Sequence, residues 1–153
     1  MRIYCLILLL LSCKLVTACS CESLGNFFKA AEASELVVKV KVMEKLAGAN
    51  DFNEKMRVQL IETFKGDEER KFITILGDDG DECRPYIDYF NVGDVCYLAL
   101  FNYQDEYELS ICGEFYLKVI EGVVEGDRND SSELATVSGL TENQLLKRLV
   151  KNK

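Results

Sequence analysis

The chain has 153 residues, of which 48% are hydrophobic and 29% charged, with one proline and ten glycines; this fits one folded domain and excludes a disordered or collagen-like chain. The formal net charge of −8 disfavours nucleic-acid partners and anionic lipids, which carry the same sign of charge. Histidine is absent, which excludes Ser-His-Asp and Cys-His nucleophile pairs, HExxH zinc sites and histidine acid–base catalysis. We therefore expect a protein that is not an enzyme and that holds no cofactor and no metal ion of its own.

The N-terminus has the pattern of an export signal. Arg2 precedes the apolar run Ile3–Leu11, and small residues follow at Val16 and Ala18. The run is shorter than the roughly 20 apolar residues that span a bilayer. We expect residues 1–18 to be a cleaved signal peptide and residues 19–153 to be the mature domain. The mature protein is then secreted, or delivered to the periplasm or the outer cell surface.

The expected mature chain contains five cysteines. An exported protein meets an oxidising compartment, so disulfides are expected, and an odd count leaves at least one cysteine unpaired or modified. Val16-Thr17-Ala18-Cys19 also fits a bacterial lipobox, in which Cys19 would carry a diacylglyceryl group, and a membrane is an expected partner only in that case. The mature cysteines are Cys19, Cys21, Cys83, Cys96 and Cys112.

The first elements expected are a short helix and two strands. Ser23 is a suitable N-cap for a helix with Leu24, Phe27, Phe28 and Ala31 on one face. Strict alternation of apolar residues and lysines then predicts a half-buried strand. A loop and a second strand follow. The two strands are expected over Leu36–Val42 and Met56–Phe64, with the loop over 47–53.

Three further strands are expected, and the chain then closes with a hairpin and a helix. The third strand covers Phe72–Leu76, and an acidic loop over 77–82 leads to Cys83. The fourth, Val95–Phe101, is apolar on both faces and therefore central. The fifth, Tyr107–Ile111, alternates Tyr107, Leu109 and Ile111 and ends at Cys112.

Beyond the fifth strand, Phe115–Val124 reads as a hairpin that turns at Glu121-Gly122, and 128–132 is polar and expected to be exposed. Thr141 and Gln144 have the spacing of a capping box, with Leu140 and Leu145 at staple positions. The final helix is expected to bury a stripe of four residues: Leu145, Leu146, Leu149 and Val150.

Five closely spaced strands with a helix at each end predict a mainly β fold, a small closed β-barrel. A β-sandwich is the alternative.

Several motifs occur in a characteristic order. A Cys19-Ser20-Cys21 start precedes a helix, the strand LVVKVKV and a strand ending in TFKG; a loop cysteine and a strand closing in LSIC follow. In this order they resemble the N-terminal netrin-like (NTR) domain of the tissue inhibitors of metalloproteinases (TIMPs). The resemblance is closer to single-domain bacterial relatives whose mature chain starts with CxC. It covers about residues 19–115 and leaves 116–153 as a C-terminal extension.

The resemblance implies a five-stranded OB-type barrel with two disulfides, Cys19–Cys83 and Cys21–Cys112. Cys96 is then left over, and its place on an apolar strand predicts a buried free thiol. Three departures stand out: the family's third cysteine pair and the second domain of the animal proteins are absent, and Glu22-Ser23-Leu24-Gly25 lacks the prolines typical of those proteins.

The resemblance also implies a function. The free α-amine and carbonyl of Cys19 would chelate the catalytic zinc of a target metalloprotease, and Ser20 would point into its specificity pocket. The expected protein is thus a monomeric inhibitor whose partner is a zinc metalloprotease. The alternative is a membrane-tethered lipoprotein of the same fold, which acts as a non-inhibitory binding or structural module. In that case Cys83 needs another partner, such as Cys96.

Overall fold

A computed structural model describes residues 22–48, 53–80, 83–126 and 137–151 of the chain. Five strands close a barrel in the order β1-β2-β3-β5-β4, and β4 pairs back with β1. The β3–β5 pairing is parallel, and the other pairings in the barrel are antiparallel. The strands are β1 (Leu36–Ala47), β2 (Asn53–Lys65), β3 (Phe72–Leu76), β4 (Val95–Tyr103) and β5 (Glu106–Glu108).

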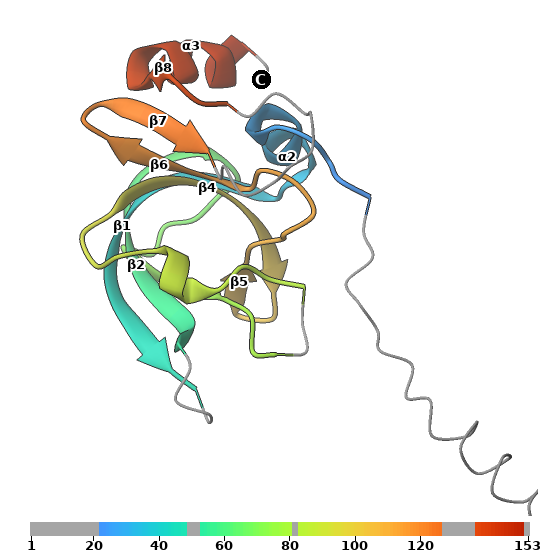
Figure 1. Cartoon of the computed structure of the whole chain (residues 1–153), viewed down its shortest axis with the longest axis vertical. Helices are drawn as coiled ribbons and strands as arrows, with labels where there is room; N and C mark the ends of the chain where they lie inside the picture. The colour runs from blue at the N-terminus through green and yellow to red at the C-terminus, as the bar shows by residue number, and fades with distance from the viewer. Residues whose placement is uncertain (1–21, 49–52, 81–82, 127–136, 152–153) are drawn as a thin grey trace, which may run out of the picture.

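This closed barrel confirms the predicted fold class and excludes the sandwich (Figure 1). It is compatible with an OB-type domain. Alternation explains which face of β1 turns inward: Val38, Val40 and Val42 are buried, whereas Lys41 is exposed. Register shifts between β1 and β2, for example between Val42 and Glu44, bend the pair as closure requires.

Three strands extend the sheet beyond β4. They are β6 (Tyr116–Ile120), β7 (Val123–Gly126) and β8 (Leu140–Thr141). The predicted hairpin turn is confirmed, because Glu121 and Gly122 connect β6 to β7 with φ values of 52° and 80°. Two positive φ angles are characteristic of a type I′ turn, which suits a two-residue hairpin. The predicted polar segment 128–132 lies outside the described residues.

The helix near the N-terminus is shorter than predicted. Helix α2 covers Phe27–Ala33, and its N-cap is Asn26, whose side chain accepts a hydrogen bond from the backbone N–H of Lys29. The expectation that Ser23 caps this helix is wrong, and Leu24 is 44% exposed instead of lying on the buried face. The reason is that residues 24 and 25 are held by backbone hydrogen bonds to other parts of the chain.

The C-terminal helix α3 (Glu142–Lys151) begins as predicted. Thr141 and Gln144 exchange the two hydrogen bonds of a capping box. Its buried stripe is narrower than expected, because Leu145 is fully buried and Val150 is 67% exposed. Two side-chain hydrogen bonds also fix α3 to the barrel, because Glu142 accepts one from Lys39 and one from the Tyr97 hydroxyl.

Strand β5 also ends earlier than predicted. Tyr107 and Leu109 are buried as expected, but Ile111 is 46% exposed. The chain leaves the strand after Glu108, so the period-2 alternation no longer determines which side chain points inward. A short 3-10 helix, η1 (Ile87–Tyr89), lies between β3 and β4. Within the described ranges, no helix combines the length and the apolar character that a membrane crossing requires.

Candidate functional site at the N-terminal edge

The segment that leads from the N-terminus into α2 lies along residues 112–114. The backbone N–H of Leu24 donates to the carbonyl of Cys112 at 2.7 Å, and the N–H of Glu114 donates to the carbonyl of Gly25 at 2.9 Å. Gly113 permits this approach, because a Cβ there would lie 3.1 Å from the Gly25 carbonyl oxygen and its φ is 145°. The path of the chain at this edge is therefore fixed by backbone contacts.

A buried carboxylate reinforces the same edge. Glu114 is 8% exposed, and it accepts hydrogen bonds from the backbone N–H groups of Phe27 at 3.0 Å and Val137 at 2.9 Å. Gly126 leaves room for this side chain, because a Cβ on Gly126 would lie 1.6 Å from one Glu114 oxygen. One acid thus connects the start of α2 to the segment that precedes β8. No sequence pattern marks Glu114, which follows a cysteine and a glycine outside any periodic element.

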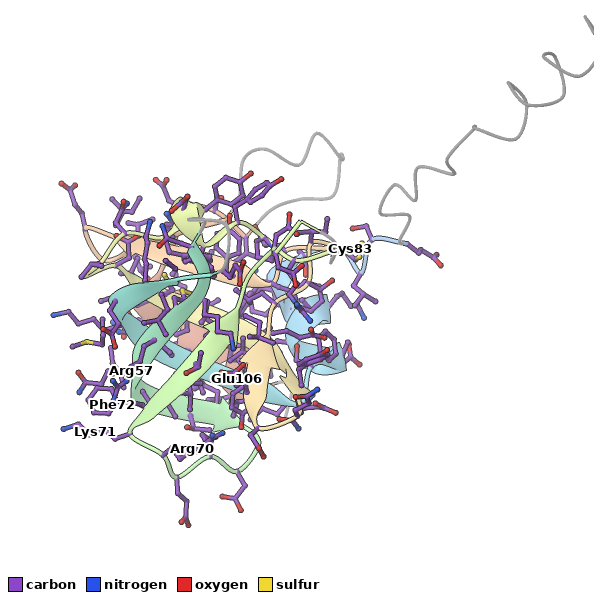
Figure 2. The ribbon with its side chains drawn as sticks, turned by 90° about the horizontal axis from the view of Figure 1, so that it is seen from below. Arg57, Arg70, Lys71, Phe72, Cys83 and Glu106 are labelled. Carbon is purple, nitrogen blue, oxygen red and sulfur yellow. The ribbon has the colours of Figure 1, made fainter. Side chains whose placement is uncertain are left out.

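Two of the predicted site cysteines lie at this edge. The carbonyl of Cys83 accepts a hydrogen bond from the N–H of Ile111, the neighbour of Cys112. Cys83 and Cys112 are both disulfide-bonded, and Cys83 lies on the side of the barrel where the N-terminal segment enters (Figure 2). Cys19, Ser20 and Cys21 lie outside the described residues, so the pairs Cys19–Cys83 and Cys21–Cys112 stay predictions.

Cys96 behaves as predicted. It is fully buried on β4 and is the free cysteine among the described residues. Burial raises the pKa of its thiol to about 12, because the thiolate loses its hydration in the apolar interior. Cys96 is therefore not the disulfide partner of Cys83.

A small pocket opens beside Cys83. It has a volume of about 270 Å³, and its lining includes Cys83, Arg84 and Glu108. The Arg84 side chain is 7% exposed and pairs with Glu108 at 2.7 Å, and its guanidinium lies 4.9 Å from the centre of the Tyr103 ring. The sequence did not reveal this ion pair, because Arg84 and Glu108 are 24 positions apart and belong to no motif.

Exposed apolar side chains occur on the N-terminal segment, at the end of β4 and after β5. Leu24 is 44% exposed, Ile111 is 46% exposed and Tyr103, which covers Arg84, is 39% exposed. Apolar groups beside a partly buried arginine are typical of the surfaces that proteins use to bind one another. In the part of the chain that the structure describes, no three His, Cys, Asp or Glu side chains gather as a metal site.

A second group of polar side chains lies on the barrel wall, away from Cys83 (Figure 2). The guanidinium of Arg57 and the ammonium of Lys71 lie 5.1 and 5.6 Å from the centre of the Phe72 ring. Nearby, Arg70 pairs with Glu68 at 2.6 Å. This pairing lowers the pKa of Glu68 to about 2, because a carboxylate beside a guanidinium is stabilised in its charged form.

No protein-family model matches this chain, and no match to it was found among curated proteins. The resemblance to the TIMP family therefore depends on the motifs quoted above. The closed barrel is the feature that the resemblance implies and that the structure has.

Proposed function

We propose that the chain is an exported inhibitor of zinc metalloproteases that acts through its own N-terminus. Mature Cys19 would supply its α-amine and carbonyl to the target's zinc, and Ser20 would enter the adjacent specificity pocket. The protein performs no reaction in this mechanism. Its contribution is a rigid N-terminus of defined chemistry.

The observation that supports the proposal best is the fixed path of residues 24–27. Leu24 is three positions after Cys21, and its N–H is hydrogen-bonded to the carbonyl of Cys112, itself disulfide-bonded. The predicted Cys21–Cys112 bridge therefore requires little additional movement of the chain. A terminus anchored in this way loses little conformational entropy when it binds.

The chemistry of the ligand is coherent with this geometry. A catalytic zinc keeps one coordination position open for water, and a neutral amine at about 2.0–2.1 Å is able to displace that water. The amine and the carbonyl of one residue together form a five-membered chelate ring. The exposed side chains of Leu24 and Ile111 and the Arg84 pocket would then contact the protease around its active-site cleft.

Lipidation of Cys19 defines the competing function, a membrane-tethered module without inhibitory activity. A thioether on Cys19 would remove the predicted Cys19–Cys83 bridge and leave Cys83 to find another partner. Cys83 is disulfide-bonded and Cys96 is a buried free thiol, so Cys96 does not serve as that partner.

The test combines mass spectrometry with inhibition. Non-reducing peptide mapping of the naturally exported protein is expected to show a free Cys19 amine and the linked peptides Cys19–Cys83 and Cys21–Cys112. The protein is then titrated against a panel of zinc metalloproteases, beside a form that carries one additional alanine before Cys19. We expect inhibition by the first form and none by the second, with equal thermal stability. Equal inhibition by both forms, or a diacylglyceryl group on Cys19, would contradict the proposal.

A further inference from the structure

A second cavity lies on the outside of the barrel. It occupies about 510 Å³ between α2, the end of β2 and α3, a volume within the range of about 300–1,000 Å³ typical of small-molecule sites. Figure 1 shows α2 and α3 at the same end of the molecule. The residues that line this cavity differ from those that line the Cys83 pocket, and none of them belongs to the site described above.

The wall of this cavity is apolar and partly aromatic. Val37 and Ala31 are buried, and Phe28, Phe64 and Leu149 pack against the core while remaining partly accessible. The Phe64 ring stacks on Tyr97 with centroids 5.7 Å apart, which holds one wall of the cavity in place. A hydrocarbon chain that lay against these side chains would remove apolar surface from water.

The rim of the cavity carries more positive than negative charge. Lys29 and Lys65 line it, and the guanidinium of Arg148 lies 5.7 Å from the centre of the Phe28 ring. Glu32 is the one carboxylate in the described lining, and it pairs with Lys29 at 3.2 Å. The described lining therefore has two cations and one anion, and Arg148 adds a third cation beside it, against the Phe28 ring, although the whole chain has a net charge of −8.

Lys65 has a particular role at the rim. Its ammonium donates hydrogen bonds to the carbonyls of Ala31 at 3.1 Å and Glu32 at 2.7 Å, at the C-terminal end of α2. These contacts offset the partial negative charge of the helix terminus. An ammonium has three N–H donors, so Lys65 retains one for an anion in the cavity.

We propose that this cavity binds an amphipathic carboxylate of the fatty-acid class. The tail lies against Phe28, Phe64 and Leu149, and the carboxylate lies among Lys29, Lys65 and Arg148. The proposal is independent of protease inhibition, since it uses neither the N-terminal segment nor the disulfides.

Calorimetric titration of the oxidised mature protein with dodecanoate, at concentrations below micelle formation, tests this directly. Dodecyltrimethylammonium has the same tail with the opposite charge, and butyrate has the same head group without the tail. We expect saturable one-to-one binding of dodecanoate and no measurable binding of the other two. Absence of dodecanoate binding, or equal binding of the cationic analogue, would overturn the proposal.

Two matched double variants locate the binding. Lys29→Glu with Arg148→Glu reverses the rim charge, and we expect the affinity for dodecanoate to fall at least about tenfold. Arg57→Glu with Lys71→Glu is the control on the barrel wall. Like the first pair, it removes one lysine, one arginine and one ion pair. Both of its cations lie over the Phe72 ring, whereas in the first pair Arg148 lies over the Phe28 ring. We expect this control to bind dodecanoate within about twofold of the unmodified protein.

An equal loss of affinity in both double variants would show a general charge effect and refute a defined site. Amide chemical shifts give an independent location, whatever the variants do. Dodecanoate is expected to perturb the amides of Phe28, Ala31, Phe64 and Leu149 and to leave those of β3 unchanged. Shifts that are spread over the whole surface would also refute the site.

Discussion

Glu114 and Phe27 are 87 positions apart in the sequence, yet the Glu114 carboxylate accepts the backbone N–H of Phe27 at 3.0 Å. The backbone N–H of Glu114 in turn donates to the carbonyl of Gly25. One residue therefore holds the N-terminal segment by both its main chain and its side chain. Together with the hydrogen bond between Leu24 and Cys112, these contacts fix the segment that leads into α2.

Replacement of Glu114 by glutamine should destabilise the protein. The amide keeps one acceptor oxygen but brings an NH₂ group toward backbone donors, and a buried donor without a partner costs about 1–3 kcal/mol. We expect the free energy of unfolding, measured by urea denaturation, to fall by about this amount. Glu69→Gln is the matched control on an exposed loop position, where a change within about 0.5 kcal/mol is expected. Equal stability of the two variants would show that Glu114 contributes nothing specific.

The elements of the barrel could be predicted because their signals are local. The Val–Lys alternation of β1, the Glu121-Gly122 turn and the Thr141/Gln144 capping box each depend on a few neighbouring residues, and the structure confirms all three. The start of α2 could not be predicted in this way, because it depends on contacts with residues far away in the sequence. Ser23 is a good N-cap by composition, but residues 24 and 25 are fixed by hydrogen bonds to Cys112 and Glu114. Tertiary contacts therefore moved the start of α2 to Phe27.

Of the residues in the candidate site, only the cysteines could be predicted from the sequence. Cys83 and Cys112 were identified through a family resemblance, whereas Glu114 and the Arg84–Glu108 pair were not identified. Charged residues are abundant in this chain, so an isolated acid or arginine carries no pattern that marks it as buried. Burial follows from the folded path, in which residues 25, 84, 108 and 114 approach one edge. That approach depends on the whole fold and not on any local pattern of residues.

Acid should weaken the Glu68–Arg70 contact in the loop between β2 and β3. The hydrogen bond from Arg70 lowers the pKa of Glu68 to about 2, below the usual value of about 4.3. The contact is therefore fully stabilising above about pH 4.5, and its contribution is lost as the pH falls toward 2. After allowance for solvent screening, we expect on the order of 1 kcal/mol.

The measurement compares the unfolding free energies of the wild type and Glu68→Gln at pH 6 and at pH 2.5. The difference between the two proteins should be smaller at the lower pH, since protonation of Glu68 removes the same charge as the substitution. Glu69→Gln serves again as the control, because it removes a neighbouring carboxylate and leaves the ion pair between Glu68 and Arg70 in place. A constant difference for Glu68→Gln would contradict the pairing.

Inhibition should also weaken on acidification, because the proposed zinc ligand is an amine that binds only in its neutral form. A free α-amine has a pKa of about 7.7–8.0 and binds zinc only when neutral. We expect the inhibition constant to rise about tenfold for each pH unit below that range. A small hydroxamate measured on the same protease corrects for titration of the enzyme itself. If the inhibition constant, so corrected, does not change between pH 8 and pH 6, the amine is not the ligand.

The state of the cysteines gives the last prediction. A mature chain that begins at Cys19 has five cysteines, so two disulfides leave one thiol, which we assign to Cys96. This thiol is fully buried, and its pKa is raised to about 12. Because the thiolate is the reactive species, Ellman's reagent should detect almost no thiol in the native protein at pH 8. Concentrated guanidinium chloride should expose one equivalent.

Cys96→Ala is the matched variant for this titration. It should show no thiol in the native or the unfolded state, while both disulfides remain intact. The small cavity left by the sulfur should cost about 1 kcal/mol of stability. Three thiols in the unfolded wild type would mean that one predicted bridge is absent from an unmodified chain, whereas two would indicate that a thioether on Cys19 has removed the Cys19–Cys83 bridge. One thiol that reacts rapidly in the native protein would place the free cysteine outside the core and contradict the assignment to Cys96.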